Sequence, residues 1–101
     1  MGQATSEHEH LSPEWEAALA AFAEDLRRRA VSRKTMRAYG SDVEQLARWS
    51  TRQGLHPARI DVRALRRFAA GLSQNGNSPA TVARKLAALR ALLRVQVQLG
   101  H

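Results

Sequence analysis

Residues 32–54 of the chain read SRKTMRAYGSDVEQLARWSTRQG, and their spacing predicts one long amphipathic helix. Ser32 is a good N-cap, and Gly54 is the residue expected to end the helix in the left-handed conformation. Between these ends, apolar and small side chains recur every three or four positions. They form the predicted inward stripe, which consists of Met36, Tyr39, Val43, Leu46, Ala47 and Ser50.

A second long helix is predicted further along the chain, and it starts in the same way. Ser78 repeats the cap, Pro79 suits the first helical position, and Gly100 marks the end. Its predicted inward stripe consists of Val82, Leu86, Leu89, Leu93 and Val97. Both long helices begin with Ser-x-x-Thr, at residues 32–35 and 78–81, which is a weak internal echo.

Each long helix is preceded by another predicted helix. The first starts at the Ser12 cap and ends near Ala30, with an inward stripe of Trp15, Ala18, Leu19, Phe22 and Leu26. A connector at residues 55–60 leads to the third, which Asp61 caps and which turns inward Val62, Leu65, Phe68, Ala69 and Leu72. Four helices without a strand candidate predict an all-α fold of two antiparallel helical hairpins packed on each other.

Composition excludes several classes of protein. The 101 residues include 16 Lys and Arg, nine Asp and Glu and no Cys, for a formal net charge of +7. Without Cys there is no disulfide framework, thiolate zinc site or thiol nucleophile. No stretch is apolar enough to span a membrane, and the polar, acidic start is not a signal peptide. We expect a cytoplasmic protein with a flexible acidic tail at residues 1–11 and one domain at residues 12–100.

The charge is unevenly distributed along the chain. Residues 1–25 carry six acids and no base, whereas residues 26–101 carry all 16 bases and three acids, so the formal charges are −6 and +13. Fourteen of the bases are Arg, whose guanidinium suits bidentate contacts with phosphate. This basic body indicates a nucleic-acid partner first and an anionic membrane surface second.

Helical wheels place cations on the side of the first long helix away from Val43 and Leu46, and beside the inward stripe of the second. On the first, one side carries Arg33, Arg37, Ser41, Glu44 and Arg48, with Lys34 adjoining. On the second, a strip consists of Thr81, Arg84, Lys85 and Ala88. Small residues and hydroxyls permit close approach to a phosphate backbone, while Arg and Lys supply charge. Any solvated helix also has a charged face, but such a face mixes signs, and only Asp42, Glu44 and Asp61 offset the 16 bases.

No group of residues fits an enzyme active site. His56-Pro-Ala-Arg59 lies in a connector without a nucleophile at a suggestive spacing. His8 and His10 lack the further ligands that a metal site requires. Tyr39 belongs to an inward stripe, so we expect it to pack with its hydroxyl at the rim. We therefore expect no cofactor, no metal and no small-molecule substrate.

Two stretches resemble signatures of the amino-terminal domain of tyrosine recombinases, the family of phage integrases and Xer-type enzymes. Residues 32–49 resemble the pattern S-x-x-T-x-x-x-Y-x-x-D-[LV]-x-x-[FL]-x-x-[FW]. Residues 78–90 resemble S-x-x-T-[IV]-x-R-x-L-[SA]-A-[LI]-R. Between them, residues 60–72 look like the family's short third helix, so the resemblance covers about residues 13–100.

The resemblance implies a SAM-like, orthogonal four-helix bundle that forms the core-binding half of a clamp around duplex DNA. In the family, the second and fourth helices of this domain lie against the recombination core site, and the first commonly contacts a neighbouring protomer of the synaptic complex. Together with the wheels, the resemblance gives the candidate DNA-binding residues Ser32, Arg33, Lys34, Thr35, Arg37, Ser41, Ser78, Thr81, Arg84, Lys85 and Ala88.

The family's catalytic domain, with its nucleophilic Tyr, has no counterpart in these residues. We therefore expect a non-catalytic module of a longer parent that breaks and rejoins DNA for integration or recombination. The alternative is a helical adaptor whose arginines bind an acidic protein partner, and it predicts indifference to DNA.

Overall fold

The computed structural model describes residues 10–100 and contains, over that range, four α-helices, one short 3₁₀-helix and no strand. The helices are α2 (Pro13–Arg28), α3 (Arg33–Arg52), η1 (Pro57–Arg59), α4 (Val62–Gln74) and α5 (Pro79–Gln98). The all-α prediction is thus confirmed, and η1 lies within the predicted connector. Most of the predicted tail, residues 1–9, lies outside the described residues, whereas Leu11 packs against the edge of the core.

All four predicted N-caps are confirmed. Each cap side chain accepts a hydrogen bond from the backbone N–H three residues later. The distances are 3.2 Å at Ser12, 3.1 Å at Ser32, 2.8 Å at Asp61 and 3.2 Å at Ser78. Because an N-cap contributes about 1 kcal/mol, these residues fix where each helix begins.

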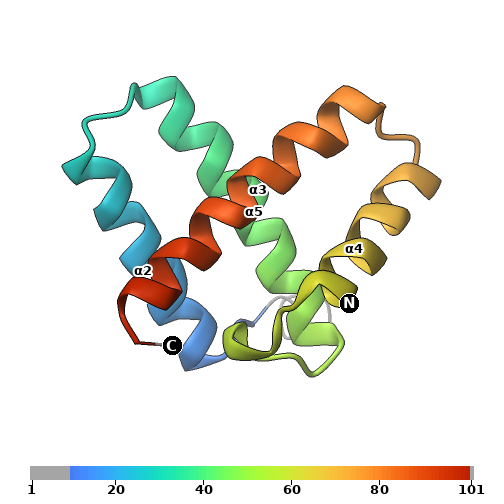
Figure 1. Cartoon of the computed structure of the whole chain (residues 1–101), viewed down its shortest axis with the longest axis horizontal. Coiled ribbons are helices and arrows are strands. Elements are labelled where there is room, and N and C mark those ends of the chain that lie inside the picture. Colours follow the sequence, from blue (N-terminus) through green and yellow to red (C-terminus); the bar gives the residue numbers. More distant parts are fainter. Residues whose placement is uncertain (1–9, 101) are drawn as a thin grey trace, which may run out of the picture.

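The helices form two hairpins, as predicted. Figure 1 shows α2 beside α3 in one hairpin and α4 beside α5 in the other, with α5 crossing α3. Helix α5 is central because it packs against α2, α3 and α4. The buried apolar core draws on every helix and consists of Trp15, Ala18, Phe22, Leu26, Val43, Leu46, Ala47, Ile60, Ala64, Phe68, Leu72, Ala88, Leu89, Leu92 and Val95.

Two residues predicted to point inward do not. Val62 is 63% exposed and Val97 is 72% exposed. At the start of α4, Ala64 takes the inward position together with Phe68. In α5, contact with three helices buries a broader surface that includes Leu92, so a single stripe ending at Val97 is wrong.

Two tryptophans connect separate parts of the bundle. The indole N–H of Trp15 donates a 2.8 Å hydrogen bond to the backbone carbonyl of Leu55, which fastens the connector to α2. Trp49 of α3 meets Phe68 of α4 edge to face, with the ring centroids 5.3 Å apart. Trp49 therefore packs between the two hairpins of the chain.

Candidate nucleic-acid interface

The first turns of α3 carry hydroxyl groups that are hydrogen-bonded to each other and cations that form no ion pair with the described carboxylates. Ser32 donates a 2.9 Å hydrogen bond to the Thr35 hydroxyl while it caps the helix. Arg33, Lys34 and Arg37 are exposed, and no carboxylate in the described part of the chain forms an ion pair with them. Ser41, which was predicted on the same helix, is exposed as well, so a ligand could reach it together with these cations.

These cations stand at the end of the helix where the backbone dipole is positive. Acidic side chains are the favourable choice there, and α2 has Glu14 and Glu16 in its first turn. Helix α3 has no acid in its first turn and places Arg33 and Lys34 there instead. An anion bound at this end would interact favourably with both the dipole and the two cations.

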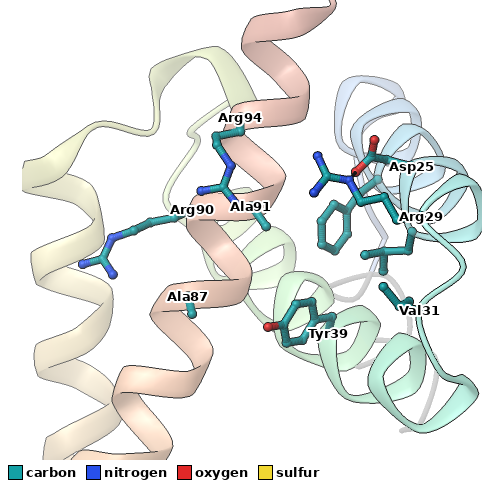
Figure 2. A pocket seen from close by; sticks show the side chains of 10 residues that line it. Asp25, Arg29, Val31, Tyr39, Ala87, Arg90, Ala91 and Arg94 are labelled. Atoms are coloured by element: carbon teal, nitrogen blue, oxygen red, sulfur yellow. Dashed lines mark ion pairs between the residues drawn. The ribbon is translucent and has the colours of Figure 1, made fainter.

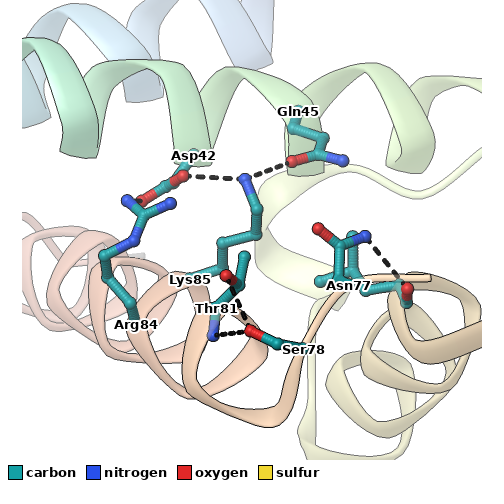
Figure 3. A network of polar contacts seen from close by, with 8 residues as sticks. Asp42, Gln45, Asn77, Ser78, Thr81, Arg84 and Lys85 are labelled. Carbon is teal, nitrogen blue, oxygen red and sulfur yellow. Dashed lines mark hydrogen bonds and ion pairs between the residues drawn. The ribbon is translucent and has the colours of Figure 1, made fainter. Parts of the chain in front are cut away.

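The start of α5 has the same hydroxyl geometry. Ser78 donates a 3.1 Å hydrogen bond to the Thr81 hydroxyl and accepts one from the Thr81 N–H (Figure 3). The first turn of α5 also lacks an acid. The internal echo in the sequence is thus a structural repeat, in which two long helices begin with the same capped turn.

One turn further along α5, two of the predicted DNA-binding cations bind a buried carboxylate instead of pointing freely outward. Asp42 of α3 is 2% exposed, and it accepts from Arg84 at 2.7 Å and from Lys85 at 2.9 Å (Figure 3). The Lys85 ammonium also donates to the Gln45 side chain at 2.8 Å. These four side chains form the charged crossing of α3 and α5.

The predicted strip on α5 therefore needs correction. Ala88 is fully buried, so it has no surface for contact with DNA. The Lys85 side chain is 13% exposed and faces α3, which leaves little of it for a ligand. The Arg84 side chain is 46% exposed and keeps a free edge. The wheel failed because α5 is enclosed by helices on several sides, so positions flanking its stripe are also buried.

Sequence reasoning missed Asp42 and Gln45 as partners of these cations. A signal was available for Asp42, because it lies three residues after Tyr39 and four before Leu46, on the inward half of the helix. A carboxylate in that position needs cationic partners when the helix packs.

The two capped turns do not converge on one compact site. In Figure 1, α3 and α5 begin toward opposite ends of the horizontal axis, which is the 39 Å long axis of the molecule. Two separate contact points suit an extended polyanion better than a small anion. Among the described residues, no cluster of His, Asp and Glu is arranged to hold a metal.

A different group of arginines, at the end of α2, has a structural role. Arg28 and Arg29 pair with the buried Asp25 at 3.1 Å and 2.8 Å, and Arg27 pairs with Glu24 at 2.6 Å. These ion pairs add to the favourable position of cations near the negative end of the helix dipole.

A pocket of about 360 Å³ is lined by Asp25 and Arg29, together with Tyr39, Arg90 and Arg94. Figure 2 shows Arg29 turned to Asp25, while Arg90 extends away from both toward α4. Because the charges of Asp25 and Arg29 satisfy each other, these two residues do not form a charged ligand site.

Comparison with known proteins identifies the family of the chain. The family model described as the phage integrase N-terminal SAM-like domain matches residues 19–100. The chain belongs to this family. As a phage-integrase SAM-like domain, it is also 39% identical over 79 residues to the tyrosine recombinase XerC of Pseudomonas fluorescens.

That alignment covers 76% of the chain and 26% of the relative, so this phage-integrase domain spans about a quarter of the recombinase it matches. No solved structure matches the chain significantly. None of the helices between residues 10 and 100 combines the length and the hydrophobicity that a membrane span requires.

Proposed function

We propose that this domain binds duplex DNA through the first turns of α3 and α5, as the core-binding module of a tyrosine recombinase. The parent enzyme would break and rejoin the DNA strands with a further, catalytic domain, and other protomers would join it in a synaptic complex. Support comes from family membership and from the charge at the start of α3.

The cations at the start of α3 carry the proposal. Arg33, Lys34 and Arg37 are exposed and unpaired among the described residues, and the first two are unfavourably placed for an isolated helix dipole. A phosphate backbone would neutralise these charges and release the counterions condensed on the DNA. Cations at the start of α3 give the free helix less stability than acids would, but they favour the binding of an anion.

The α5 side of this surface contributes position more than charge. Ser78 and Thr81 are already hydrogen-bonded to each other, so their turn is fixed before a ligand arrives. Arg84 is held by Asp42 through one nitrogen, and its half-exposed guanidinium has further donors for a phosphate oxygen. Contacts of this kind set the register of the domain on the duplex and read little sequence.

The test is a fluorescence-anisotropy titration of a labelled duplex at several salt concentrations. The triple variant Arg33→Gln, Lys34→Gln and Arg37→Gln should bind more weakly, with a salt slope of log K shallower by about 3. Its matched control is the triple variant Arg52→Gln, Arg90→Gln and Arg94→Gln, which removes the same charge from exposed positions outside this surface. The control should bind DNA as tightly as the unsubstituted domain.

Equal losses in both triple variants would mean that only net charge matters. If the unsubstituted domain is folded by circular dichroism but does not bind duplex DNA at low salt, the alternative of an adaptor for an acidic protein is favoured.

A further inference from the structure

Helix α4 carries a cationic face that the sequence analysis did not single out. Arg63, Arg66 and Arg67 lie three and four positions apart, on the side of the helix away from the buried Ala64 and Phe68. All three arginines are exposed, and exposed Ala70 continues their row one turn later. We call Arg63, Arg66 and Arg67 the α4 arginine face.

No acid offsets this face. Helix α4 contains no Asp or Glu, and Asp61 just before it is engaged as the N-cap through a 2.8 Å bond from the Ala64 N–H. Among the described residues, no carboxylate forms an ion pair with any of the three arginines. A face that served only solubility would mix both signs of charge.

One member of the face is also held in place. The Arg67 guanidinium lies 5.8 Å from the centre of the Trp49 ring, within the range of a cation–π contact. Trp49 is itself fixed against Phe68 in the joint between the hairpins. A guanidinium that is ordered in advance loses less side-chain entropy when it binds.

The α4 arginine face is separate from the α3 surface described above. In Figure 1, α4 lies toward one end of the long axis and the first turn of α3 toward the other. A single duplex would therefore need to run along the molecule to reach both.

We infer that the α4 arginine face is a second binding surface for the phosphate backbone of duplex DNA. Phosphate fits because exposed guanidiniums present paired donors to its oxygens, and the small Ala70 leaves room for close approach. This surface goes beyond the proposed function, and it rests on that function only for the choice of DNA as the polyanion.

The variant that tests it is Arg63→Gln with Arg66→Gln, which leaves Arg67 on Trp49 and keeps good helix formers. With a duplex of about 24 base pairs, the salt slope should become shallower by about 2, and affinity at low salt should fall. The control is Arg94→Gln, an exposed arginine of α5 outside both surfaces, and the changes in slope are compared per charge removed. An unchanged slope in the α4 variant, or an equal change in the control, would overturn the inference.

The outcome is distinguishable from failure of the α3 proposal. If only the α4 variant weakens binding, the second surface stands and the α3 surface fails; if only the α3 triple variant does, the reverse holds.

Discussion

The ammonium of Lys85 lies 2.9 Å from the carboxylate of Asp42, at the point where α5 crosses α3. The Asp42 side chain is 2% exposed and that of Lys85 is 13% exposed, so this is a nearly dry ion pair. The Arg84 guanidinium is a second cation, 2.7 Å from the same carboxylate, and it lies on the side of the network that reaches solvent. The two hairpins are thus joined by a charged contact, and removal of one partner should leave an uncompensated charge in a poorly solvated site.

Substitution of Asp42 by Asn should destabilise the domain strongly. It leaves Lys85 with an uncompensated charge in a poorly solvated site, and we expect a loss of about 2–4 kcal/mol in the free energy of unfolding. The measurement is urea denaturation followed by circular dichroism. The control is Glu44→Gln on the same helix, because Glu44 pairs with Arg48 at the surface and its loss should cost below about 0.5 kcal/mol. Similar losses in both variants would contradict the burial of Asp42.

The two cations of the network should differ in weight and couple to each other. Arg84→Gln should cost below about 1 kcal/mol because the side chain is half exposed and Asp42 keeps Lys85. Lys85→Met should cost about 1–3 kcal/mol, since it removes the more enclosed partner. The double variant strands Asp42 without a cation and should cost about 3–5 kcal/mol, more than the sum of the single losses. Additive losses in a double-mutant cycle would mean that the two cations do not share the carboxylate.

This network shows where prediction from the sequence ends. The helices could be predicted because their signals are local: Ser32 and Ser78 cap their own helices, and Gly54 adopts a φ of 73° at the expected stop. The partners of α5 are a tertiary property. A wheel places Lys85 beside the inward stripe of its own helix, and it cannot show that the crossing helix buries Lys85 against Asp42.

The candidate site divides along the same line. Arg33, Lys34 and Arg37 near the free start of α3 are exposed as predicted, because no helix crosses there, and their contact with DNA stays a prediction. Ala88 lies in the middle of α5, a helix that packs against three others, and it is buried against expectation.

The acid titration of Glu24 should depend on Arg27. The hydrogen bond and the charge of the Arg27 guanidinium, 2.6 Å away, hold the pKa of Glu24 below its ordinary value of 4.5. A lowered pKa means that this pair favours the folded state above pH 4.5 and loses its effect as the pH falls through the folded-state pKa. In Arg27→Gln, an NMR titration of the Glu24 carboxyl should show the pKa rising toward 4.5. An unchanged titration would show that the ion pair does not persist in solution.

Replacement of Ala30 by Gly should stabilise the domain. Ala30 has a φ of 57° directly after α2, in the left-handed region that costs a residue with a side chain about 1–2 kcal/mol. Glycine removes that strain but adds flexibility to the unfolded chain, so a net gain of about 0.5–1 kcal/mol remains in urea denaturation. The matched control is Ala20→Gly, an exposed position inside α2 with ordinary helical geometry, which should lose about 0.5–1 kcal/mol. Because the substitution is the same in both, opposite signs can come only from the backbone conformation, and a loss at both positions would mean that α2 does not end in a left-handed turn at Ala30.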